Sequence, residues 1–261
     1  MTNPLQGRRI LVTRPAAQAG ALAALVAERG GEAVCFPLIE ISAADDPEPL
    51  RQAIARLADY GLAIFISPNA VAHSLPQILA ARAWPEGLAV AAIGPGTVAQ
   101  LNVNGVTEVI VPDERFDSAA LLERPELQAE RMAGRKVLIL RGNGGREELA
   151  ETLRARGAQV DAVTVYRRSP PDSSEPFLSL LRNTTLDALT ISSSEGLRNL
   201  QALLDTENTD VFRRTPVFVP HQRIAEVATD LGWENVILTR PADAGIIESL
   251  CTFNWPQHDR S

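Results

Sequence analysis

One strand–helix unit occurs twice in this chain, at a constant spacing of 127 positions. Residues 7–32 (GRRILVTRPAAQAGALAALVAERGGE) align without gaps with residues 134–159 (GRKVLILRGNGGREELAETLRARGAQ), and eight aligned positions are identical. Each copy reads as a buried strand, a polar turn and an amphipathic helix that ends at a glycine, Gly30 or Gly157. The chain must therefore fold into at least two copies of one β-α unit.

Two further pairs of segments follow the same pattern. Residues 62–79 align with residues 187–204, and residues 88–111 align with residues 215–238. Short apolar strands alternate with helical patterns throughout, which is typical of parallel α/β sheets with helices on both faces. A length of 261 residues fits two such sheets of about five strands each.

One extended segment in each half lies outside this rhythm. CFPLIEI (35–41) and DAVTVYRR (161–168) are rich in β-forming residues, and each precedes a stretch of Pro, Ser and acidic residues typical of a linker, at 42–49 and 169–176. These pairs predict two strands that run between two lobes.

Charge and hydropathy exclude several classes of partner. Lys and Arg total 25 against 32 Asp and Glu, so the formal net charge is -7, and no basic run offers a footprint for nucleic acid. The longest uncharged window, residues 87–107, contains glycines, a proline and amides that exclude a membrane span. The polar N-terminus lacks the pattern of a secretory signal, so we expect a cytoplasmic protein.

Metal and nucleophile chemistry find little support in the sequence. Cys35 and Cys251 have no metal-ligand spacing, and in a reducing compartment they are expected to be free thiols. The histidines His73, His221 and His258 lie far apart, so we predict no metal site. No serine has the glycines of a nucleophile elbow around it.

Ligands of parallel α/β sheets collect beyond the carboxyl ends of the strands, so the turns there are the candidate binding segments. They are small, polar or basic, and each lies where exposed amides at a helix N-terminus favour anions. Ser, Asn, Thr and Gly are also ordinary capping and turn residues, and for any single turn we favour that interpretation. The six turns comprise residues 13–15, 67–69, 94–97, 141–145, 192–194 and 221–223.

Two of these turns resemble nucleotide-binding motifs. Gly94-x-Gly96-x-x-Ala99 follows a strand, and Asp113 stands nineteen positions after Gly94, as in a dinucleotide fingerprint, although the twin segment at 217–226 has no glycines. The Arg141-Gly-Asn-Gly-Gly turn lacks the Lys-Ser/Thr ending of an ATP-binding loop. A nicotinamide-dependent enzyme that uses Gly94 to Ala99 is therefore an alternative, and ATP use is not indicated.

Tyr166 is one of only two tyrosines and lies on the predicted interlobe strand VTVYRR. Its phenol has the chemistry of a weak acid or hydrogen-bond donor that faces a cleft. A tyrosine on a strand is also commonly packed with its hydroxyl at the surface, and both interpretations stay open.

The order and spacing of seven segments resemble the uroporphyrinogen-III synthase family. The segments are LVTRP (11–15), CFPLIEI (35–41), FISPNAV (65–71), AIGPGTV (92–98), RGNGGREEL (141–149), VTVYRR (163–168) and ISSSEGL (191–197). Each segment alone is common, but together they cover almost the whole chain. At residues 219–224 the chain reads VPHQRI, where the family usually has Ser or Thr in the turn.

The resemblance implies two flavodoxin-like lobes joined by a two-stranded antiparallel ladder. Residues 1–36 and 169–261 would form the first lobe, residues 42–160 the second, and residues 37–41 and 161–168 the ladder. The repeat alignment agrees, because exchanging the first β-α unit between the halves builds both lobes from the same parts. A linear cut near residue 130 is the alternative.

The resemblance also implies a reaction, namely closure of the linear tetrapyrrole hydroxymethylbilane to uroporphyrinogen III with loss of water and inversion of ring D through a spiro intermediate. No cofactor is implied. Tyr166 would donate to the leaving hydroxyl in the crevice between the lobes, while the turns hold the substrate's acetate and propionate groups. The binding residues would be Arg14, Ser67, Asn69, Gly94, Gly96, Thr97, Arg141, Gly142, Asn143, Arg168, Ser192, Ser193, Ser194, His221, Gln222 and Arg223.

Two other functions stay open besides this monomeric, cytoplasmic lyase of haem and sirohaem biosynthesis. One is a two-lobe module that closes on a small anion without catalysis. The other is the nicotinamide-dependent enzyme.

Overall fold

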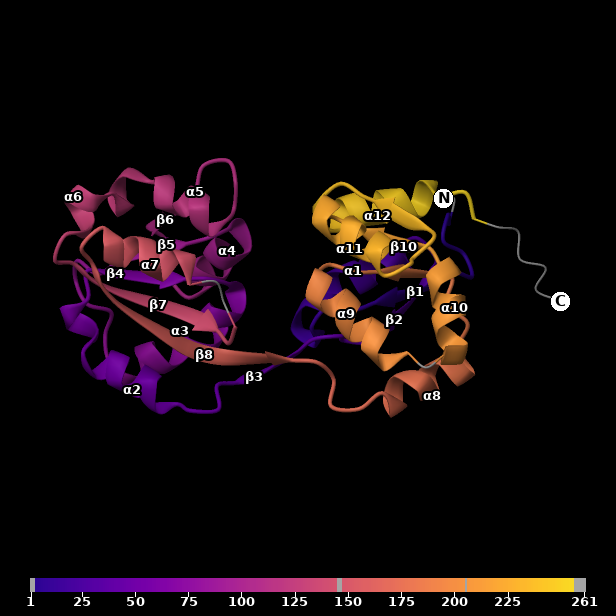
Figure 1. Ribbon diagram of the computed structural model, residues 1–261, viewed down its shortest axis with the longest axis horizontal. Coiled ribbons are helices and arrows are strands. Elements are labelled where there is room, and N and C mark those ends of the chain that lie inside the picture. Colours follow the sequence, from indigo (N-terminus) through magenta and orange to yellow (C-terminus); the bar gives the residue numbers. More distant parts are fainter. Residues whose placement is uncertain (1–2, 145–146, 205, 256–261) are drawn as a thin grey trace. The chain divides into compact units, whose positions relative to one another are not determined.

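The computed structural model describes residues 3–144, 147–204 and 206–255. The chain divides into two compact units (Figure 1): unit 1 comprises residues 1–40 with 169–261, and unit 2 comprises residues 41–168. Each unit is built on a sheet flanked by helices. The α/β class and the two sheets predicted from the repeat are therefore confirmed.

Unit 2 contains, within its described residues, a six-stranded sheet in the order β3-β8-β7-β4-β5-β6. From β8 to β6, neighbouring strands pair in parallel. The strands are β3 (Glu40–Ala43), β4 (Leu62–Phe65), β5 (Ala89–Ala92), β6 (Val109–Ile110), β7 (Lys136–Gly142) and β8 (Gln159–Ser169).

Helices cover both faces of this sheet, because the central strands are apolar on both sides. One face packs on α2 (Glu48–Ala55), α3 (Pro68–Ala81) and α4 (Pro95–Val103). The other packs on α5 (Ser118–Glu123), α6 (Ala129–Met132), α7 (Glu148–Ala155) and the short turn η2 (Pro125–Leu127). A further short turn, η1 (Leu57–Asp59), leads into β4.

Unit 1 contains, among its described residues, a five-stranded parallel sheet in the order β11-β10-β9-β1-β2. Its strands are β1 (Arg9–Val12), β2 (Glu32–Cys35), β9 (Ala188–Thr190), β10 (Val217–Val219) and β11 (Val236–Leu238). One face packs on α8 (Glu175–Asn183), α9 (Ser194–Leu203), α10 (Thr206–Arg214) and α11 (Gln222–Asp230). The other packs on α1 (Ala16–Glu28) and α12 (Ala242–Thr252).

The two sheets are built from equivalent strands. The unit 2 order β8-β7-β4-β5-β6 corresponds strand for strand to the unit 1 order β2-β1-β9-β10-β11, which is the 2-1-3-4-5 arrangement of flavodoxin-like sheets. The repeated β-α units are β1-α1 and β7-α7, as the alignment predicts. Both helices are followed by a glycine with positive φ, Gly30 at 82° and Gly157 at 88°, a conformation that costs glycine little.

The segment CFPLIEI is not one continuous strand, contrary to the prediction. β2 ends at Cys35, and β3 begins at Glu40. The amides of Phe36 and Leu38 still donate to Val12 and Thr13, but these are adjacent residues where a regular parallel ladder would use alternate ones, so the register is lost after β2. Residues 161–168 pair with β7 along most of their length, so they are a strand of the unit 2 sheet as well as a predicted connector.

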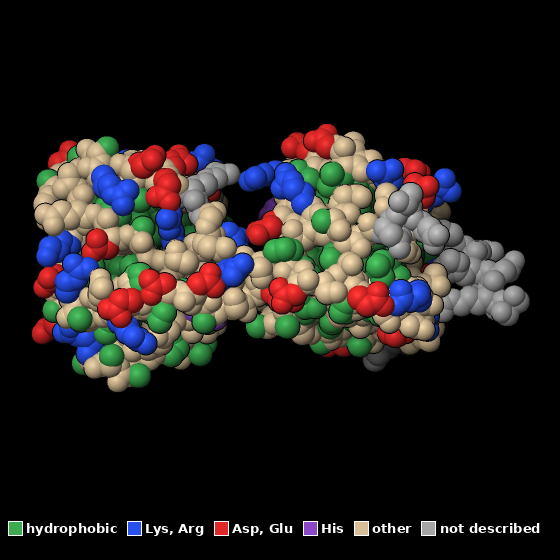
Figure 2. Space-filling model, turned by 60° about the horizontal axis from the view of Figure 1, so that its bottom comes forward, with side chains coloured by type: hydrophobic (Ala, Val, Ile, Leu, Met, Phe, Trp, Pro, Cys, Tyr) green, Lys and Arg blue, Asp and Glu red, His purple; other side chains and the backbone are tan. Residues whose placement is uncertain are grey.

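Acidic and basic side chains lie interspersed on each unit on the face shown in Figure 2. Within the described ranges, no helix is long and apolar enough to cross a membrane.

Candidate functional site

Most of the predicted site residues lie at the carboxyl ends of parallel strands. In unit 2, Ser67 and Asn69 follow β4, and Gly94 follows β5. Arg141 and Gly142 end β7, and Tyr166 is near the end of β8. Because parallel strands end at the same edge of a sheet, these residues share the carboxyl edge of unit 2.

Two hydroxyl groups meet at this edge. The Ser67 Oγ donates to the Tyr166 Oη at 3.0 Å, and it accepts the amide of Ala70 at 3.1 Å as the N-cap of α3. The capping hydrogen bond therefore holds the Ser67 side chain in one rotamer, and the second hydrogen bond of Ser67 holds the Tyr166 hydroxyl in place.

The Tyr166 ring reaches Ser67 across β7, which lies between β8 and β4 in the sheet. Gly142 ends β7, and a Cβ built there would lie 2.6 Å from the ring's Cζ and 2.9 Å from its hydroxyl. The φ of Gly142 is ordinary, so the glycine is required for space. The ring also stacks on His73 of α3, with centroids 5.9 Å apart, and only 4% of Tyr166 is exposed.

Asn143 extends the β7–β8 pairing past an irregularity between Arg141 and Gly142. Its amide N–H donates to the Tyr166 carbonyl at 3.2 Å. Its side chain accepts from the Arg168 N–H at 2.7 Å and donates to the Arg168 carbonyl at 3.1 Å. Asn143 is a predicted binding residue, but its side-chain bonds to Arg168 hold the backbone around Tyr166. The predicted turn continues into Gly145, which lies outside the described residues.

The turn after β5 lies next to the turn after β4. A Cβ at Gly96 would lie 3.5 Å from the Cγ of Pro68, and one at Gly94 would lie 3.4 Å from the Cβ of Phe116. Thr97 is 3% exposed, so its side chain belongs to the core rather than to the surface of the turn.

Unit 1 offers a different set of groups at its carboxyl edge. Ser193 caps α9 through the Gly196 amide at 2.9 Å, and Ser192 and Ser194 flank it, half-buried. The hydroxyl of Thr13 donates to the Thr190 carbonyl at 2.8 Å and is buried.

The two arginines related by the 127-residue repeat are both paired. Arg14 binds Asp243 at 2.5 Å, and Arg141 binds Glu147 at 2.6 Å; both arginine side chains are about four-fifths buried, with 18% and 20% exposed. Asp243 follows Ala242, whose φ of 67° is strained for a residue with a Cβ. Neither predicted arginine is therefore a free cation, because each already holds a carboxylate of its own unit.

The atypical turn after β10 is exposed. His221, Gln222 and Arg223 all face solvent, and Gln222 bonds to Glu226 at 3.3 Å. Within the described part of the chain, Arg223 has no hydrogen-bond or ion-pair partner, so it is the most available cation among the predicted binding residues of unit 1.

Comparison with known proteins identifies the family to which the chain belongs. The family model described as uroporphyrinogen-III synthase HemD matches residues 20–248. The chain belongs to the uroporphyrinogen-III synthase family. The family's member from Salmonella typhimurium is 35% identical over 238 residues, covering 90% of this chain and 96% of that protein, and the Escherichia coli member is 33% identical over 239 residues with the same coverage.

Solved structures of the uroporphyrinogen-III synthase family share the fold. A mutant synthase from Thermus thermophilus superposes with a TM-score of 0.60 at 17% identity, covering 93% of this chain and 96% of that one. The synthetase from Helicobacter pylori gives 0.57 at 16% identity, covering 92% and 96%.

Membership of the uroporphyrinogen-III synthase family leaves the nicotinamide alternative without support. Asp113, the acidic residue of that motif, is held by Arg124 at 2.7 Å through both carboxylate oxygens. Its carboxylate is therefore engaged by Arg124, whereas the dinucleotide motif needs it to accept hydrogen bonds from a ribose hydroxyl. Among the described residues, no three His, Cys, Asp or Glu side chains gather as metal ligands.

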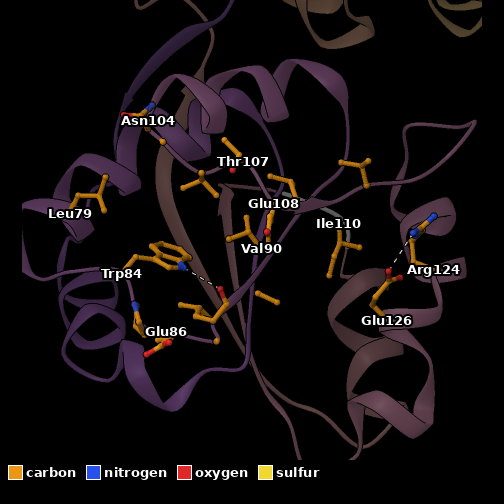
Figure 3. A pocket seen from close by; sticks show the side chains of 18 of the residues that line it. Leu79, Trp84, Glu86, Val90, Asn104, Thr107, Glu108, Ile110, Arg124 and Glu126 are labelled. Carbon is orange, nitrogen blue, oxygen red and sulfur yellow. Dashed lines mark hydrogen bonds and ion pairs between the residues drawn. The ribbon is translucent and has the colours of Figure 1, made fainter.

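A hollow of about 1010 Å³ in unit 2 (Figure 3) is lined by none of the predicted binding residues. Its lining comes from the amino ends of β5 and β6 and the loops before them, including the ring of Trp84, and from residues after β6 that include Asp113 and Arg124. Glu86 and Glu108 are exposed there, while Arg124 is paired with Asp113 and Glu126. This charge opposes a polycarboxylate, so the hollow is not a site for a uroporphyrinogen precursor.

Sequence reasoning placed Pro68 in the candidate turn at 67–69 but missed two members of the unit 2 edge, His73 and Phe116. Pro68 and His73 lie on the first turns of α3, and Phe116 precedes α5. The contact of Pro68 with Gly96 follows from the parallel pairing of β4 and β5. Phe116 sits in an irregular loop without periodicity, so no pattern marked it.

Proposed function

We propose that this chain is a uroporphyrinogen-III synthase, a lyase of tetrapyrrole biosynthesis that closes hydroxymethylbilane to uroporphyrinogen III. Family membership over nearly the whole chain supports the activity. The observation that carries the mechanism is the Ser67–Tyr166 bond at 3.0 Å, because it holds a phenol, a group that can donate a proton, in one place at the carboxyl edge.

The reaction needs proton transfer and orientation more than a nucleophile. A pyrrole nitrogen expels the hydroxyl of hydroxymethylbilane, and that oxygen takes up a proton and leaves as water. The substituted carbon of ring D then bonds to the resulting azafulvene and gives a spiro intermediate. The rearrangement that inverts ring D releases one proton, so the proton count balances.

Tyr166 supplies the proton to the departing hydroxyl and regains one when the macrocycle closes. Its ring is packed in the core of unit 2, and Ser67 and His73 hold it. A fixed donor of this kind acts without reorganisation as the charge develops.

The turns bind the eight carboxylates of the substrate. Local groups outweigh the net charge of -7, because charges are screened beyond about 8 Å at physiological salt. Backbone amides at Gly94 and Gly96 and the side chains of Arg168 and Arg223 form part of this set. Arg14 and Arg141 join it by exchanging their own carboxylate partners for those of the substrate.

We also propose the arrangement of two lobes and a connecting ladder that the sequence analysis predicts. Residues 1–36 with 169–261 and residues 42–160 are the two lobes, and residues 37–41 and 161–168 form an antiparallel ladder that joins them. Adjacent positions of β3 and β8 in one sheet support the ladder. The monomeric state and the cytoplasmic location stay predictions.

An isomer assay tests the activity. Purified protein is incubated with hydroxymethylbilane, and the products are oxidised and separated by chromatography. A synthase gives isomer III in excess, whereas closure in buffer gives isomer I. If the product is identical to that formed in buffer alone, the proposal is wrong. The remaining alternative is then a small-anion binding module, and direct titration with hydroxymethylbilane would detect its binding.

Tyr166→Phe tests the proton donor, and the chain supplies its own control. General acids typically contribute 10²–10⁴ in rate, and because the pyrrole nitrogen already assists, we expect a loss of about 10² in kcat with KM little changed. The other tyrosine, Tyr60, donates to Asp161 at 2.5 Å at the amino ends of the strands, and burial together with this acceptor raises its pKa. Tyr60→Phe should lower stability by about 1 kcal/mol and leave kcat unchanged. Equal kcat values for the two variants would remove Tyr166 from the mechanism.

A further inference from the structure

An exposed aromatic ring stands at the end of the unit 2 carboxyl edge. Phe116 is 55% exposed, and it is the only aromatic among the large exposed apolar side chains of the described residues. A single exposed apolar residue is ordinary on a protein surface, so exposure alone assigns no role. What matters is where this ring lies and what holds it there.

A continuous chain of contacts links Phe116 to Tyr166. The Tyr166 hydroxyl bonds to Ser67, the neighbouring Pro68 faces Gly96 at 3.5 Å, and Gly94, two residues earlier, faces the Cβ and Cγ of Phe116 at 3.4 and 3.8 Å. These distances at the glycines are measured from built Cβ positions, so a Cβ at Gly94 would be in ordinary van der Waals contact with Phe116. The ring therefore lies on the same edge as the phenol.

The residues on either side of Phe116 form side-chain bonds to α5. The exposed ring therefore lies on a segment that is attached to the rest of unit 2. Arg115 binds Glu123 at 2.7 Å, and Asp117 caps α5 through the Ala120 amide at 2.7 Å. Both bonds fix the backbone around Phe116 while its side chain stays half in solvent. Burial of a phenyl ring is favourable, so an apolar face left open on an anchored segment is available to a ligand.

We propose that Phe116 is a substrate-positioning residue that stacks on one pyrrole ring of hydroxymethylbilane. This inference rests on the proposed function and names a contact within the same site. Offset or edge-to-face pairing with a flat pyrrole ring suits a phenyl side chain, and it is the same before and after the hydroxyl leaves, so it contributes to binding. The carboxylates around the pyrrole would be taken by the neighbouring amides of the Gly94 turn.

Steady-state kinetics of a Phe116 series test the contact. Phe116→Ala removes the aromatic contact with the pyrrole ring. It should raise KM about two- to tenfold relative to the wild-type protein and leave kcat within twofold. Phe116→Tyr keeps the ring and should restore the wild-type KM, whereas Phe116→Leu keeps apolar bulk without an aromatic face and should resemble Phe116→Ala. Val103→Ala, at a residue of α4 that is 82% exposed, is the matched control and should change nothing.

The outcomes separate this inference from the function on which it rests. If the wild-type protein forms isomer III and Phe116→Ala has the wild-type KM, only the role of Phe116 is overturned. A wild-type KM for Phe116→Leu overturns it as well, because bulk alone would then suffice. If the wild-type protein gives no isomer III, the proposed function itself fails. Thermal unfolding of each variant confirms that the fold is intact before kinetics are compared.

Discussion

The carboxyl edges of the two units share one topology and differ in chemistry. In unit 2, Tyr166 crosses the end of β7 at Gly142 and bonds to Ser67. At the 127-residue spacing, Ile39 replaces Tyr166 and Pro15 replaces Gly142 in unit 1. Ser193 caps α9 as Ser67 caps α3, and Gly196 of that helix lies 4.0 Å from the Cδ1 of Ile39, measured from a built Cβ.

The difference shows that the repeated fold positions the groups and that single residues decide the chemistry. An alkyl side chain at Ile39 can neither donate nor accept a proton, so the acid function that we propose for Tyr166 has no counterpart at this position of unit 1. The unit 1 edge keeps a hydroxyl that caps α9 and an arginine paired with Asp243. The framework of strands is present twice, whereas the phenol and the glycine beneath it occur once.

The largest effect is expected from Gly142→Ala. The added methyl would lie 2.6 Å from the Tyr166 ring, so the ring must leave its place beside Ser67. Overpacking of this kind typically costs about 1–3 kcal/mol of stability, and kcat should fall at least as far as in Tyr166→Phe. Urea unfolding and the isomer assay measure the two effects.

A double variant shows whether the clash is the cause. Gly142→Ala combined with Tyr166→Ala removes the ring that the methyl strikes, so the two stability losses should not add. Additive losses, or full activity of Gly142→Ala alone, would mean that the ring does not cross β7 as described.

A smaller effect is expected from Ser67→Ala, and its twin Ser193→Ala is the matched control. Both variants lose a helix N-cap, so each should lower the free energy of unfolding by about 1 kcal/mol. Only Ser67→Ala also releases Tyr166, which should lower kcat by up to about tenfold, the size of one net hydrogen bond. Equal kcat values for the two variants would show that Tyr166 needs no support from Ser67.

The repeat made both sheets predictable, together with the turns at their carboxyl edges. Periodic apolar strands, glycines after the helices and caps such as Ser67 are local signals, and the structure follows them. The connector at 35–41 reads as one strand because its apolar residues are β-forming. The loss of register after Cys35 lies in which carbonyls Phe36 and Leu38 bond to, and the residue types do not show it.

The contacts within the site could not be predicted in the same way. Ser67 and Tyr166 are 99 positions apart and lie on strands separated by β7, so their bond depends on the missing side chain at Gly142. Asp243 reads as an ordinary acidic residue in the first turn of a helix. Its ion pair with Arg14, 229 positions away, and the positive φ of the preceding Ala242 have no signature in the amino-acid pattern.

The smallest effect is expected at the two paired arginines, where the units are most alike. Asp243→Asn in unit 1 and Glu147→Gln in unit 2 each remove the internal carboxylate charge that holds an arginine. If that carboxylate occupies the place of a substrate carboxylate, its loss should lower KM by about two- to fivefold, since partly exposed pairs contribute at most about 1 kcal/mol. Added salt should shrink the difference between variant and wild-type protein, because it screens both partners. An unchanged KM with a lower free energy of unfolding would mean that the ion pair only stabilises the fold. If only Asp243→Asn behaves in this way, the substrate carboxylates are bound by Arg141 and not by Arg14.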